Sequence, residues 1–94
     1  TILREIKIIF TEMLKAYSES DLLMSEKVIK DTDRLLEEIM NLVSEKQNIN
    51  YRMALETLKE VCKNIKSIGE VAFNRSVREM MALQERELKN LQKT

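Results

Sequence analysis

The chain has 94 residues, 44% apolar and 34% charged, and its 16 Lys and Arg balance its 16 Asp and Glu. One domain is the expected content of this length, and zero net charge excludes the one-signed field that nucleic-acid binders use to neutralise phosphates. The sequence holds no His and a single Cys, Cys62, which removes the commonest general base, His-paired nucleophiles and the usual zinc sites. We therefore predict a protein that is not an enzyme, binds no nucleic acid and uses no cofactor.

The composition favours helices throughout. There is no Pro and one Gly, whereas sheets and loop-rich folds need more of these residues at their turns. No stretch approaches the roughly 20 apolar residues of a membrane helix, and no basic-then-apolar leader is visible. Cys62 lies on an apolar helical stripe, which indicates a small buried hydrophobe in a reducing compartment. We expect an all-α, cytoplasmic domain over residues 1–94 with no direct membrane insertion.

The first two helices are predicted over about residues 2–17 and 21–46. In both, apolar residues recur at steps of three and four, the spacing of an amphipathic helix. Ser20 is the expected N-cap of the second helix, because a serine hydroxyl can accept from a free backbone N–H of the first turn. Asn48 or Asn50 is expected to cap the third helix.

The third helix is predicted over about residues 51–92, with the strongest periodicity of the chain. Its inner positions follow alternating steps of four and three, a heptad register, and are Tyr51, Leu55, Leu58, Cys62, Ile65, Gly69, Ala72 and Ser76. Flanking apolar residues widen this stripe, which suits a bundle better than a two-stranded coil. The sequence thus predicts an up-down-up three-helix bundle.

The predicted helices differ in length. At 1.5 Å per residue the third spans roughly 60 Å, against roughly 40 Å and 25 Å for the second and first. Its C-terminal part should therefore overhang, carrying Met80, Met81 and Leu83. An exposed apolar ridge of this kind usually packs on a protein partner. We also expect a homodimer, because self-association would stabilise so short a chain. The alternative is a frayed terminus.

Gly69 stands inside the helix with the strongest periodicity. A glycine costs up to about 1 kcal/mol relative to alanine in a helix interior, so it usually has a packing or functional reason. Small residues at inner positions let a neighbouring helix approach closely. We predict that Leu58, Ile65, Gly69 and Ala72 form the packing interface of the third helix.

The same segment resembles the PhoU family of phosphate-uptake regulators. The last helix of the family's three-helix repeat carries a signature close to Glu-Arg-Ile-Gly-Asp followed by Ala and Asn. Here residues 66–70 read Lys-Ser-Ile-Gly-Glu, and Ala72 and Asn74 follow. Residues 26–39 are similar to the family's second helix. The resemblance covers about residues 3–80 and implies a single repeat, whereas family regulators typically hold two; similar repeats also occur as appendages of sodium/phosphate cotransporters.

One departure bears on metal binding. The family signature supplies two acids four residues apart, which can ligate a metal ion through hard oxygen atoms. In this chain the first of the two positions is Lys66, so Glu70 loses its acidic partner, and the two side chains can neutralise each other. We therefore treat Glu70 as the one candidate metal ligand and expect the site to be empty.

The resemblance implies a regulatory module that controls phosphate uptake by docking on a transporter or a sensor kinase. The alternative is a generic helical scaffold or oligomerisation module unrelated to phosphate. It explains the periodicity equally well but gives the run from Ile68 to Asn74 no role beyond packing. A second rival is a metal-binding variant of the family, with a divalent or ferric ion near Glu70.

Overall fold

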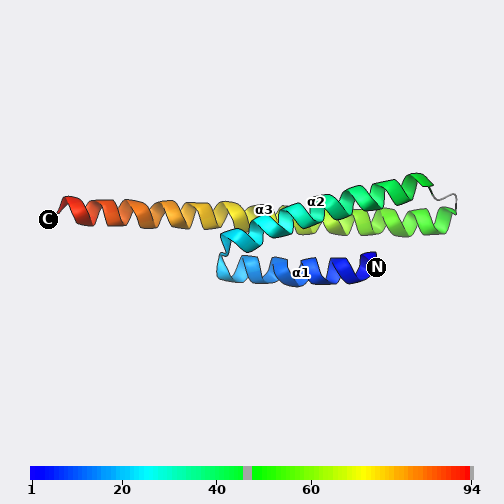
Figure 1. Ribbon diagram of the computed structural model, residues 1–94, viewed down its shortest axis with the longest axis horizontal. Coiled ribbons are helices and arrows are strands. Elements are labelled where there is room, and N and C mark those ends of the chain that lie inside the picture. Colours follow the sequence, from blue (N-terminus) through cyan, green and yellow to red (C-terminus); the bar gives the residue numbers. More distant parts are fainter. Residues whose placement is uncertain (46–47, 94) are drawn as a thin grey trace.

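The computed structural model describes residues 1–45 and 48–93. These residues form three helices, α1 (Ile2–Glu19), α2 (Leu22–Glu45) and α3 (Ile49–Gln92), and contain no strand. Figure 1 shows that α1 and α3 run in the same direction and α2 runs against them. The predicted all-α, up-down-up bundle is confirmed, while the predicted end of the second helix at Lys46 lies outside the described residues.

The predicted cap of α2 is wrong. Ser20 ends α1 instead, because its backbone adopts the left-handed conformation (φ 51°) and its N–H donates to the carbonyl of Ala16. Asp21 is the residue that caps α2, since its carboxylate accepts from the N–H of Met24 at 3.0 Å. A left-handed residue closes a helix, so Ser20 cannot also begin the next one. Hence α1 extends to Glu19, two residues beyond its predicted end.

The third helix begins two residues earlier than predicted. Asn48 is its N-cap, and the side-chain oxygen of Asn48 accepts from the N–H of Tyr51 at 3.2 Å. Ile49 and Asn50 are therefore already helical. One of the two predicted caps, Asn48, is thus confirmed.

The core lies where the three helices meet, along the predicted stripes. α2 contributes Val28, Leu35 and Ile39, which are almost wholly buried. The remaining members come from the inner rows of α1 and α3: Ile6, Ile9, Met13, Leu55, Cys62 and Ile65. Tyr51, the first predicted inner position of α3, is 46% exposed.

Only half of the apolar side of α1 is buried. Ile6, Ile9 and Met13 face the core, whereas Phe10 and Leu14 remain about half exposed. The sequence predicts a single apolar side on this helix. The structure divides that side into a buried row and an outward row, because two neighbouring helices cover less of α1 than its apolar arc requires.

The C-terminal part of α3 extends past the rest of the bundle. The turn between α1 and α2 reaches α3 at Glu79, whose carboxylate accepts from the Ser20 hydroxyl at 3.3 Å. From Arg78 to Lys93 every residue is exposed, and in Figure 1 the C-terminal end has no helix beside it. The predicted overhang is thus present as continuous helix to Gln92. Across the described residues, no helix is long and apolar enough to cross a membrane.

Candidate interaction site

Helices α2 and α3 pack tightly at Gly69. A Cβ atom built on Gly69 would lie 3.1 Å from the Cγ1 atom of Val28 and 3.5 Å from that of Ile29. The first distance is shorter than ordinary carbon–carbon contacts, which lie near 3.5–4.0 Å. The absence of a side chain at Gly69 therefore lets the two helices come this close.

Both helices present small residues at this crossing, with the same spacing. On α2 the buried row is Ser25, Val28, Thr32, and on α3 it is Gly69, Ala72, Ser76. The buried hydroxyls bond within their own helices, Thr32 to the carbonyl of Val28 at 2.7 Å and Ser76 to that of Ala72 at 2.8 Å. Because these polar groups are satisfied locally, the crossing is rich in hydroxyls without leaving a buried donor unpaired.

The other predicted packing residues occupy different depths. Ile65 and Ala72 are buried, and Leu58 is partly buried against the core. Met80, Met81 and Leu83 lie on the overhang and are 49%, 58% and 53% exposed. The structure therefore places Leu58, Ile65 and Ala72 on the packed side of α3, as it does Gly69. The exposed residues of the overhang form a separate surface. We call it the C-terminal ridge (Met80, Met81, Leu83 and Leu88).

Lys66 is bonded to the neighbouring helix rather than to Glu70. Its Nζ atom lies 2.6 Å from a carboxylate oxygen of Asp33 on α2. This hydrogen bond is the main reason that the pKa of Lys66 is raised, and the charge of Glu70 adds a smaller effect. Glu70 itself is exposed. The described residues contain no group of three or more Asp, Glu or Cys side chains that could hold a metal ion.

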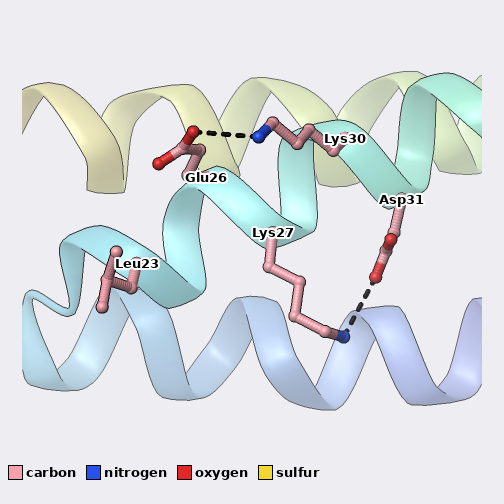
Figure 2. A pocket seen from close by; sticks show the side chains of 5 residues that line it. All are labelled: Leu23, Glu26, Lys27, Lys30 and Asp31. Atoms are coloured by element: carbon pink, nitrogen blue, oxygen red, sulfur yellow. Dashed lines mark hydrogen bonds and ion pairs between the residues drawn. The ribbon is translucent and has the colours of Figure 1, made fainter.

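A second set of charges joins α1 to α2. The Lys27 ammonium lies 2.6 Å from Glu12 on α1 and 3.0 Å from Asp31 on its own helix. Figure 2 shows Lys27 beside a shallow depression of about 290 Å³ that Leu23 and the pair Glu26–Lys30 also line. The charged groups in this depression neutralise one another, so it offers a ligand little unpaired charge.

Cys62 is fully enclosed by the core. Removal from solvent raises the pKa of its thiol above the ordinary value, because burial disfavours the thiolate. A thiol in this state is a poor nucleophile and a poor metal ligand. The structure thus places Cys62 among the packing residues.

The buried thiol has a consequence for stability. We expect the free energy of unfolding to fall as pH rises above 9.0, because the folded state keeps a thiol proton that the unfolded chain releases there. Below 9.0 both states hold the proton and this contribution is complete. Urea unfolding on both sides of pH 9.0 measures the slope. In Cys62→Ala this part of the slope should vanish, and an unchanged slope in that variant would contradict the assignment.

Comparisons with known proteins add no relative. No protein-family model matches the chain, and neither the curated proteins nor the solved structures contain a significant match.

Proposed function

We propose that this chain is a non-enzymatic regulatory module that acts in the control of phosphate uptake. Its partner would be a phosphate transporter or a sensor kinase, contacted by helix-on-helix docking in the cytoplasm. The resemblance of residues 66–74 and 26–39 to a PhoU repeat supplies the phosphate assignment. A chain with one repeat would regain the usual pair of repeats by forming a homodimer.

The observation that carries the docking mechanism is the C-terminal ridge. A 94-residue chain that exposes five large apolar side chains on one helix end, the four of the ridge among them, offers an anchor for another helix. Methionines suit such a surface, because their flexible side chains adapt to a partner's shape. Catalysis has no comparable support, since the chain lacks His and its buried Cys62 carries a raised pKa.

The test is binding of the purified chain to purified phosphate-transport components. A triple variant should weaken binding about tenfold or more; it combines Met80→Gln, Met81→Gln and Leu83→Gln. The reason is that losing an apolar anchor at the centre of an interface costs more than about 1 kcal/mol of binding free energy. All three residues are exposed, so the melting temperature should stay near the parent's. Titration calorimetry gives the affinity.

A matched control replaces exposed apolar residues away from the ridge. Leu23→Gln and Met40→Gln lie on α2 and are 77% and 58% exposed, and they should leave binding unchanged. If the ridge variant binds as tightly as the parent, the ridge is not the docking surface. If the parent binds no phosphate-transport component at all, the generic helical scaffold replaces the phosphate assignment.

A further inference from the structure

A second surface, partly apolar and exposed except at the half-buried Arg75, runs along α1 and α3. On α1 it follows steps of four and three through Leu3, Lys7, Phe10, Leu14 and Tyr17, and all five residues are exposed. On α3 an equivalent row follows the same alternation. Its members are Ala54, Thr57, Val61, Asn64, Ile68, Val71, Arg75 and Arg78. We call these two rows together the α1–α3 strip.

The two rows lie side by side. At one end the Arg75 guanidinium stacks over the ring of Tyr17, 4.4 Å from its centroid. At the other end Leu3 and Ala54 line one groove of about 480 Å³ between the start of α1 and α3. These two contacts place the α1 row beside the α3 row near both of its ends, and α1 and α3 run in the same direction (Figure 1).

The strip carries positive charge only. None of its positions is Asp or Glu, and its charged members are Lys7, Arg75 and Arg78. The charge of Arg75 is weakly neutralised, since its Nε atom lies 4.0 Å from Glu79 and makes no hydrogen bond within the described residues. A partly apolar strip that carries cations is complementary to an amphipathic helix that carries acids.

The overhang of α3 is an amphipathic helix that carries acids on or beside its ridge. Glu87 lies four residues after Leu83 and shares the face of the ridge, whereas Glu85, three residues before Leu88 and four before Lys89, lies at the edge of the ridge beside the bases. The bases occupy another row at steps of three and four. This row is Arg78, Ala82, Arg86, Lys89 and Lys93.

We infer that the α1–α3 strip of one copy of this chain binds the C-terminal ridge of a second copy. The lengths agree, since residues 3–17 and residues 80–93 each span roughly 20 Å of helix. The acids on and beside the ridge meet the cations of the strip, and the added helix covers the outward row of α1. This contact does not rest on the phosphate assignment, but it uses the same ridge, so a ridge bound to a second copy is closed to a transport component.

The contact is head-to-tail. The α3 row of the strip, continued past Arg78 at the same steps, passes Ala82, Glu85 and Lys89, whereas Met80, Leu83 and Glu87 lie on the other side of the helix. Strip and ridge therefore face different sides of one helix, and two copies side by side cannot satisfy both contacts at once. Each added copy leaves one strip and one ridge open, so assemblies grow with concentration unless a ring closes.

The test uses two full-length charge-reversal variants. The first combines Lys7→Glu with Arg78→Glu in the strip, and the second combines Glu85→Lys beside the ridge with Glu87→Lys on it. All four residues are exposed, so both variants should melt like the parent. Each alone should associate at least about tenfold more weakly than the parent, because acid then meets acid or base meets base. Sedimentation velocity over a concentration series measures association.

Mixing the two variants is the decisive step. The acidic strip of the first then meets the basic ridge of the second, and the remaining strip and ridge keep the parental charges, so the mixture should regain parental association. Lys15→Glu, also exposed and on α1 but outside the strip, should associate like the parent. A parent that stays monomeric, a variant that associates normally by itself, or a mixture that does not recover would each overturn the inference. None of these outcomes depends on a phosphate-transport component.

Discussion

Gly69→Leu should lower the free energy of unfolding by about 3 kcal/mol or more, because overpacking a tight site is destabilising. Even the first added atom, a Cβ, would lie 3.1 Å from Val28, and a leucine adds three more carbon atoms in the same direction. Val28 is fully buried, so it cannot move aside into solvent. The two helices would have to separate at Gly69, which also disturbs the neighbouring Ala72.

Two further variants show whether the tight crossing at Gly69 causes the loss of stability. Gly69→Ala should remain within about 1 kcal/mol of the parent, since the gain in helix propensity offsets the tight contact. Adding Val28→Ala to Gly69→Leu should restore part of the lost stability, because the smaller side chain leaves room for the leucine. Urea denaturation followed by circular dichroism measures all three. A Gly69→Leu chain as stable as the parent would show that the crossing is not tight.

The second large effect is expected at the centre of α2. Leu35→Ala should cost about 2–5 kcal/mol, because it removes buried methyl groups and leaves a cavity between all three helices. Leu35 is 1% exposed. A domain of this size has a total stability of roughly 5–15 kcal/mol, so this single change takes a large share of it.

Leu23 on the same helix provides the matched control. It is 77% exposed, and Leu23→Ala should change the free energy of unfolding by no more than about 0.5 kcal/mol. The comparison holds the substitution constant and varies only burial. Equal losses from the two variants would mean that burial does not decide stability here, in conflict with the core described above.

The candidate surfaces were predictable from the sequence to different degrees. Gly69 and Ala72 are recognisable because a glycine within a strong helical period is costly without a packing role, and the ridge follows from the unequal helix lengths. The partner of Lys66 was not predictable: position i+4 suggests Glu70, whereas the bundle brings Asp33 of α2 to 2.6 Å. Spacing along one helix says nothing about which residue of a neighbouring helix lies opposite.

By itself, the sequence determined the class of this protein: helices with apolar rows at steps of three and four, ended by capping residues, with no His and no second Cys for common catalytic or metal chemistry. Those properties are local, because helical period and capping depend on residues within one or two turns. Only the tertiary structure decided that Ser20 closes α1 while Asp21 opens α2, and which half of the apolar side of α1 is covered. These outcomes depend on how the helices pack together and on how much of the surface of α1 is covered by α2 and α3. That packing cannot be read from the residues of one helix.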